Sequence, residues 1–139
     1  MGRPRTFDEA VAVARAAELF AEQGYEGTSI DDLVRSLGVH RGSLYSTFGS
    51  KRALYLRVLS DHVAGLRTAG GGPDLTLLLR AAVERAPVDT EAAALVATGL
   101  QTLQTQLPAT ADSRADLARL LGERLISRAT GPAEPQEGT

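Results

Sequence analysis

Apolar residues recur at helical spacing along the chain, and no stretch alternates apolar and polar side chains with the period that a strand requires. The clearest run is Ile30, Leu33, Val34 and Leu37, which fall one and two helical turns apart on a single face. Glycine and proline interrupt this pattern at intervals. The sequence therefore predicts an all-α fold.

Capping and stop signals divide the chain into the expected helices. Thr6 and Glu9 can form a capping box at the start of the first helix, and Thr28 and Asp31 can do so for the second. Ser50 can cap the fourth helix. We expect helices over residues 6–23, 28–37, 41–47, 51–66, 75–86, 90–107 and 112–129.

The run Gly70-Gly71-Gly72-Pro73 is the clearest boundary in the chain, because three glycines disfavour a helix and proline breaks one. We expect a three-helix DNA-binding domain over residues 1–49 and a connecting helix with a glycine-rich linker over 50–72. A small helical dimerisation or regulatory domain would follow over 73–130, and a disordered tail over 131–139.

Composition excludes several classes of protein. The chain has 139 residues and no cysteine, so it has no disulfide framework, thiol nucleophile or cysteine-type zinc site. His40 and His62 are the only histidines, and no carboxylates at ligand spacing accompany them, so we expect no metal and no cofactor. No nucleophile triad, acid–base pair or phosphate loop emerges, and we do not expect an enzyme. The absence of a secretory signal or membrane segment favours a cytoplasmic protein.

Charge is distributed unevenly. The formal net charge is −2, yet residues 1–67 carry nine basic and eight acidic groups, whereas residues 68–139 carry six and nine. Residues 35–52 contain four basic groups and no acidic one. Overall acidity therefore does not exclude nucleic-acid binding, because the relevant excess of positive charge is local.

Two short helices joined by a tight turn at Gly38, Val39 and His40 are typical of a helix-turn-helix. The second helix has an apolar back, formed by Leu44 and Phe48. Its front is small, polar and basic, as a DNA-reading helix requires. The residues of this front are Arg41, Gly42, Ser43, Ser46 and Thr47, with Tyr45 beside them.

The segments Gly24 to Leu33 (GYEGTSIDDL), Leu37 to Tyr45 (LGVHRGSLY) and Phe48 to Lys51 (FGSK) together resemble the TetR family of bacterial transcription regulators. The match extends without a gap from about Arg3 to Val63. This resemblance implies a homodimeric repressor that binds a palindromic operator in double-stranded DNA. Its two recognition helices would enter successive major grooves about one helical turn apart.

The resemblance also implies roles for individual residues. Contacts to backbone phosphates would come from Thr28, Arg41, Ser43, Tyr45 and Lys51. Base edges would face His40, Arg41, Gly42, Ser46 and Thr47. Arg3 and Arg5 would form a basic arm in the minor groove, with a solvated terminus as the alternative. Tyr45 has packing on the first helix as its alternative, and His40 stands where the family often has a better-capping Ser or Thr.

The segments Ala92–Leu103 and Asp112–Ile126 resemble the final helix pair of the family, which dimerises. No charged side chain occurs from Ala92 to Ala111, and an uncharged Thr/Gln face with Gly99 for close approach suits a subunit interface. A mildly polar solvent face is the alternative. The residues predicted to form the dimer interface are Val96, Gly99, Leu100, Leu103, Leu107, Leu117, Leu121 and Leu125.

Family members usually carry a larger C-terminal domain than the one expected here, so we expect a reduced ligand pocket. All six aromatic residues precede residue 56, and a pocket would have to take its walls from Tyr55, Leu59 and His62, although Tyr55 and His62 also suit a core. An effector would be small and apolar. The alternative for the whole protein is a ligand-sensing or protein-interaction helical module that no longer binds DNA.

Overall fold

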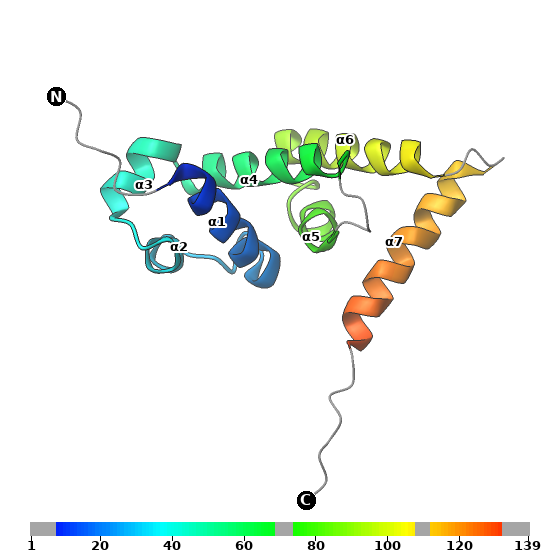
Figure 1. Cartoon of the computed structure of the whole chain (residues 1–139), viewed down its shortest axis with the longest axis horizontal. Helices are drawn as coiled ribbons and strands as arrows, with labels where there is room; N and C mark the ends of the chain where they lie inside the picture. Colours follow the sequence, from blue (N-terminus) through cyan, green and yellow to red (C-terminus); the bar gives the residue numbers. More distant parts are fainter. Residues whose placement is uncertain (1–7, 69–73, 108–111, 132–139) are drawn as a thin grey trace, which may run out of the picture.

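The computed structural model describes residues 8–68, 74–107 and 112–131, and every regular element within these ranges is an α-helix (Figure 1). The all-α prediction is confirmed. None of these helices is long and apolar enough to cross a membrane. The helices are α1 (Glu9–Gln23), α2 (Ile30–Leu37), α3 (Arg41–Phe48), α4 (Lys51–Gly65), α5 (Thr76–Glu84), α6 (Thr90–Gln106) and α7 (Ser113–Thr130).

Most helices begin where the capping signals place them. Ser50, Asp89 and Asp112 accept hydrogen bonds from amide groups in the first turns of α4, α6 and α7. Helix α1 is capped by Asp8, whereas the predicted cap Thr6 lies outside the described residues. The predicted glycine linker at 70–72 and residues 132–139 of the predicted tail also lie outside them.

The start of α2 corrects the predicted capping box. Ser29 and Asp32 form it, since each side chain accepts a hydrogen bond from the backbone amide of the other. Thr28 is fully buried, and its hydroxyl donates to the carbonyl oxygen of Gly24 at 2.7 Å. Because the Thr28 hydroxyl is bonded to Gly24, Ser29 takes the capping position and α2 begins at Ile30 and not at residue 28.

Helices α2 and α3 are joined by a tight turn and form the predicted helix-turn-helix. Gly38 ends α2 with a φ of 66°, a left-handed conformation that glycine adopts without steric cost. Val39 follows and is buried in the core. The turn therefore anchors the start of α3 to the domain while leaving His40 exposed.

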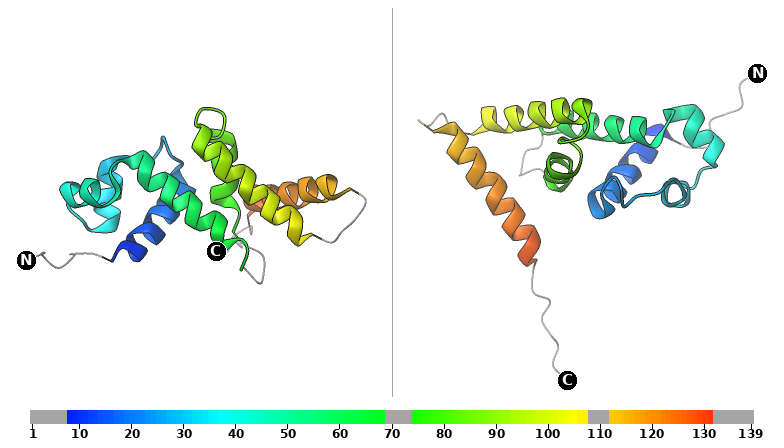
Figure 2. Two further views of the ribbon diagram at one scale, coloured as in Figure 1. Left: turned by 90° about the horizontal axis from the view of Figure 1, so that it is seen from above. Right: turned by 180° about the vertical axis from the view of Figure 1, so that it is seen from behind.

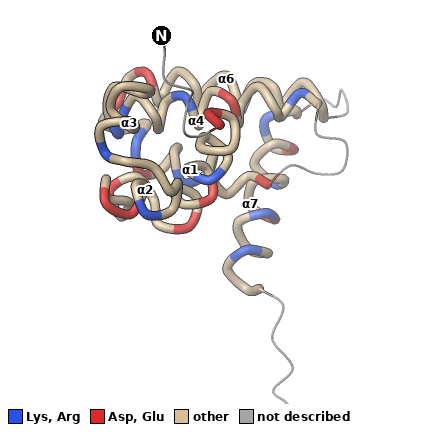
Figure 3. Tube along the Cα trace, turned by 60° about the vertical axis from the view of Figure 1, so that its left-hand side comes forward, with Lys and Arg blue, Asp and Glu red and all other residues tan. Residues whose placement is uncertain are grey.

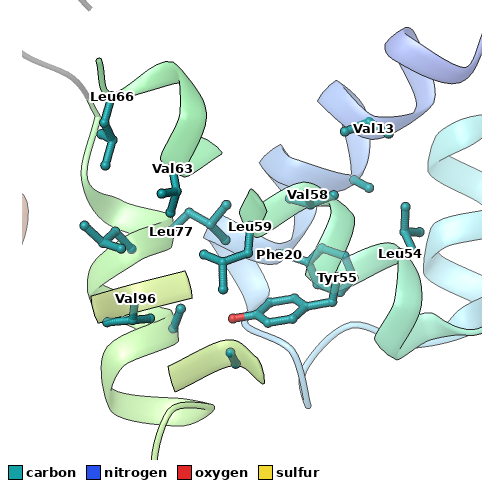
Figure 4. Packing of buried hydrophobic residues seen from close by; sticks show 14 of the residues in the cluster. Val13, Phe20, Leu54, Tyr55, Val58, Leu59, Val63, Leu66, Leu77 and Val96 are labelled. Carbon is teal, nitrogen blue, oxygen red and sulfur yellow. The ribbon is translucent and has the colours of Figure 1, made fainter. Parts of the chain in front are cut away.

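Helix α4 is the centre of the packing, because it contacts α1, α3, α5 and α6. Toward α1 it buries Leu54, Tyr55 and Val58, and the Tyr55 ring meets the edge of Phe20 at 5.1 Å between centroids (Figure 4). Toward α5 and α6 it buries Leu59, Val63 and Leu66 (Figure 4). One continuous hydrophobic core therefore runs from the helix-turn-helix to α6.

Helix α7 diverges from α6 and carries the chain away from the rest of the molecule (Figures 1 and 2). Leu117 and Leu121 pack against the core, but no residue of α7 is fully buried. In its second half, Leu125 is 57% and Ile126 63% exposed. Much of the apolar surface of α7 is therefore uncovered in the single chain.

Candidate nucleic-acid interface

Helix α3 lies at one end of the molecule, remote from α7 (Figure 1). As predicted, it has an apolar face and a polar face. Leu44 is 2% exposed, and Phe48 is half-buried against the core. The opposite face is open to solvent, with Ser43 and Thr47 half-buried at its margin. The exposed residues of this face are His40, Arg41, Gly42, Tyr45 and Ser46.

The N-terminus of α3 is uncapped by any side chain. His40 occupies the capping position but makes no capping hydrogen bond, in agreement with the poor capping expected of imidazole. The first amide groups of a helix lack partners within the helix and attract anions. A Cβ added at Gly42 would have no neighbour within 4 Å, so the backbone here is open to a close approach.

Arg41 is paired with Asp31 of α2 in the free protein. Both side chains are more than half exposed, and an exposed pair of this kind is weak. Arg41 can therefore exchange Asp31 for a phosphate or a base edge at small cost. The sequence predicted Asp31 as part of a helix cap. Its pairing with Arg41 could not be predicted, because a separation of ten residues gives no local signal.

Lys51, in the first turn of α4, lies over an aromatic ring that sequence reasoning did not single out. Its Nζ atom is 4.2 Å from the centroid of the Tyr25 ring, and the guanidinium carbon of Arg85 is 4.1 Å from the same centroid. Tyr25 belongs to the loop between α1 and α2, so three separate segments meet at this ring. Cations are attracted to aromatic faces at such distances.

Three of the residues implied as DNA contacts are not placed on the surface around α3 by the structure. Thr28 is fully buried and its hydroxyl is bonded to Gly24, so it is not placed for a phosphate contact. Arg3 and Arg5 lie outside the described residues. Tyr45, by contrast, is 42% exposed.

The predicted dimer interface is wrong at Val96, Gly99 and Leu103, which are buried within their own chain. A Cβ at Gly99 would lie 2.9 Å from Leu78 and 3.2 Å from Val63, so this glycine allows α6 to approach α5 and α4. The apolar stripe of α6 thus completes the core of the single chain. The helical periodicity was correct, but it could not identify the surface that covers the stripe.

The other predicted interface residues lie in mixed surroundings. Leu100 and Leu107 of the α6 segment are half-buried, Leu117 and Leu121 of α7 pack on the core, and Leu125 is exposed. A different face of α6 is exposed. It is uncharged, since α6 carries no charged residue after Glu91 (Figure 3). We call it the outer face of α6, and its residues are Ala94, Ala97, Thr98, Gln101 and Thr105.

The predicted pocket residues Tyr55, Leu59 and His62 are not among those that line the groove between α5 and α7. Tyr55 and Leu59 are buried in the core, where burial raises the pKa of Tyr55 to about 12. His62 is half-buried, its Nε2 atom has no hydrogen-bond partner among the described residues, and burial lowers its pKa. The groove has a volume of about 940 Å³, with Leu79 and Leu125 in its walls.

These observations define a helix-turn-helix protein with an exposed recognition helix. Residues 12–58 match the family model described as bacterial regulatory proteins of the tetR family. This part of the chain is therefore similar to the DNA-binding domain of that family.

Curated relatives support the same assignment. The chain is 48% identical over 69 residues to an uncharacterized HTH-type transcriptional regulator, YezE, of Bacillus subtilis, covering 50% of this chain and 36% of that protein. It is 40% identical over 62 residues to the HTH-type transcriptional repressor BdcR of Escherichia coli, covering 45% and 32%. The chain thus spans about a third of the length of these relatives.

Solved structures show that the likeness of fold extends beyond the DNA-binding domain. The TetR family transcriptional regulator PfmR from Thermus thermophilus superposes with a TM-score of 0.58 at 21% identity, covering 93% of this chain and 90% of that one. A TetR-family regulator from Bordetella parapertussis gives a TM-score of 0.57 at 23% identity, covering 91% and 85%.

Proposed function

We propose that the protein is a homodimeric transcriptional repressor of the bacterial cytoplasm that binds a palindromic operator through α3. The observation that carries this proposal is the exposed face of α3, where a glycine, hydroxyl groups and a weakly held arginine surround an uncapped helix N-terminus. Such a surface suits a phosphate backbone and base edges together. BdcR, a relative of the DNA-binding domain, is itself named a repressor.

Within this proposal the residues of the open face of α3, together with Lys51 of α4, divide between two tasks. Ser43, Tyr45 and Lys51 contact phosphates and set the position of α3 in the major groove. Arg41 leaves Asp31 and pairs with a base edge or a phosphate. The remaining residues of the face, which meet base edges, are His40, Gly42, Ser46 and Thr47.

Dimerisation in this proposal uses the outer face of α6 together with the uncovered half of α7. The outer face has no charged side chain, and the hydroxyls of Thr98 and Thr105 donate to carbonyl oxygens of their own helix. It can therefore be covered without leaving a charge or these donors unpaired. Leu125 and Ile126 add exposed apolar area on α7.

A small apolar effector, if the protein has one, would bind in the groove between α5 and α7. The groove is lined by apolar side chains such as Leu79 and Val83 and also by charged ones such as Arg124. The first half of α7 packs on the core through Leu117 and Leu121. An effector there would change the position of α7, and the dimer would transmit the change to the spacing of the two α3 helices.

Selection of duplexes from a random-sequence DNA pool by the purified protein tests the proposal. We expect enrichment of a palindrome whose half-sites lie about one helical turn, roughly 10 base pairs, apart. On that site Arg41→Ala should cost about 1–3 kcal/mol if Arg41 reads a base. The matched control is Arg114→Ala, which removes the same charge from α7, far from α3, and should change affinity little.

The contrary outcome is equally clear. A pool that is not enriched, with Arg41→Ala and Arg114→Ala behaving alike, would favour the alternative of a helical module that does not bind DNA.

A further inference from the structure

Asp89 is a buried carboxylate at the junction of the DNA-binding helices with α5 and α6, and its side chain is 4% exposed. It accepts two hydrogen bonds from Arg52 of α4, with Nε–Oδ2 at 2.9 Å and Nη2–Oδ1 at 3.0 Å. It accepts a third from Arg85 at 3.3 Å and also caps α6. The hydrogen bonds from Arg52 hold the pKa of Asp89 well below its usual range, so the group is ionised.

Arg85 links this carboxylate to the helix-turn-helix. Its side chain is 13% exposed and lies over the Tyr25 ring, while its Nη1 atom pairs with Glu26 at 3.2 Å. Tyr25 also packs edge-on against Tyr55, with 4.9 Å between centroids. The ring is therefore held from two sides, by the core and by an arginine that Asp89 anchors.

Lys51 is the residue at the far end of this series of contacts. Its side chain is long and flexible, and an unrestrained lysine loses much rotamer freedom when it binds a phosphate. The Tyr25 ring, 4.2 Å from Nζ, restricts the ammonium group before DNA arrives. Arg52, the neighbour of Lys51 in the first turn of α4, is itself tied to Asp89.

We infer that Asp89 is a positioning residue for DNA binding, which holds Lys51 in place through Arg52 and through Arg85 and Tyr25. The inference rests on the proposed DNA-binding function. Removal of a negative charge from a protein ordinarily strengthens its binding to DNA. Here the loss of Asp89 weakens binding.

Asp89→Asn is the variant that isolates this role. Asparagine caps a helix about as well as aspartate, so α6 keeps its N-terminal cap while the ion pairs are lost. The matched control is Glu91→Gln, which removes a neighbouring carboxylate that pairs with Arg52 at 3.2 Å but is 68% exposed. A charge effect alone would make both variants bind DNA as tightly as the wild type or more tightly.

The experiment is a double-mutant cycle of Asp89→Asn and Lys51→Ala, with a labelled duplex enriched by the wild-type protein and an unselected duplex of the same length. We expect Asp89→Asn to weaken binding to both duplexes about three- to tenfold. The slope of log affinity against log salt should also become shallower, by about the contribution of one phosphate contact for each Lys51 that loses its position. The double variant should bind no more weakly than Lys51→Ala alone. Glu91→Gln should bind like the wild type or slightly more tightly.

Additive losses in the cycle, or a D89N protein that binds as tightly as E91Q, would overturn the inference. If D89N fails to fold by thermal melting, Arg85→Gln cuts the same connection from the other side, with Arg80→Gln as its charge-matched control. R85Q should then lose affinity without adding to Lys51→Ala, and an additive loss would again overturn the inference. A wild-type protein without salt-dependent DNA binding would instead refute the proposed function.

Discussion

At the scale of single residues, burial of His62 makes the stability of the folded chain depend on pH. Burial lowers its pKa below the ordinary value of about 6.5, while the nearby charge of Asp74 opposes that change. The unfolded chain therefore binds a proton at a pH where the folded chain does not, and stability falls as the pH drops below about 6.5. We expect the melting temperature of the wild type to fall over this range and that of His62→Leu to fall less.

The second histidine supplies the control for this measurement. His40 is exposed on α3, so His40→Gln should keep the wild-type dependence of melting temperature on pH. Equal pH dependence in the wild type and His62→Leu would contradict the assignment to His62.

Local signals predicted some residue roles well and others not at all. Leu44 on the back of α3 and Ser50 at the start of α4 follow from helical period and capping chemistry, which act over a few residues. Thr28 and Asp89 do not. Thr28 is buried, with its hydroxyl bonded to the carbonyl oxygen of Gly24. Asp89 pairs with Arg52, which lies 37 residues away in the sequence, so no local pattern indicates the contact.

At the scale of elements, α6 separates what periodicity predicts from what it leaves open. The spacing of Val96, Gly99 and Leu103 correctly places them on one face. Whether that face meets α4 and α5 or a second subunit depends on the tertiary arrangement, which spacing does not contain. The bounds of α4, α6 and α7 agree with the capping signals, whereas α5 is shorter than expected and covers Thr76–Glu84.

This distinction gives a prediction for the dimer. Gln101→Arg adds a charge to the outer face of α6 and should weaken dimerisation at least tenfold, about 1.4 kcal/mol, with the stability of the single chain unchanged within about 0.5 kcal/mol. Leu103→Arg places an unpaired charge in the core and should unfold the chain, at a cost above about 4 kcal/mol. Light scattering and thermal melting distinguish the two outcomes.

The control for the outer face is Ala14→Arg, an equally charged change at an exposed position of α1. If Gln101→Arg and Ala14→Arg give the same mass in solution as the wild type, the outer face of α6 is not the interface.

At the scale of the whole molecule, the helix-turn-helix and the later helices share a single core. The glycine-rich run predicted a boundary along the chain, because glycine and proline mark a break in helix, but such a break does not show how the helices on its two sides pack. The contacts of α4 with both halves, and the ion pairs at Asp89, connect α3 to α6 through packed side chains. A movement of the later helices therefore has a physical route to the DNA-binding surface.

The most direct test of DNA binding is the dependence of duplex affinity on salt concentration. Each phosphate neutralised by lysine or arginine contributes a slope of about −0.9 to the plot of log affinity against log salt. Arg41 and Lys51 from two subunits make four phosphate contacts, which predict a slope of about −3.6 or steeper for the wild type. A slope near zero would contradict the account.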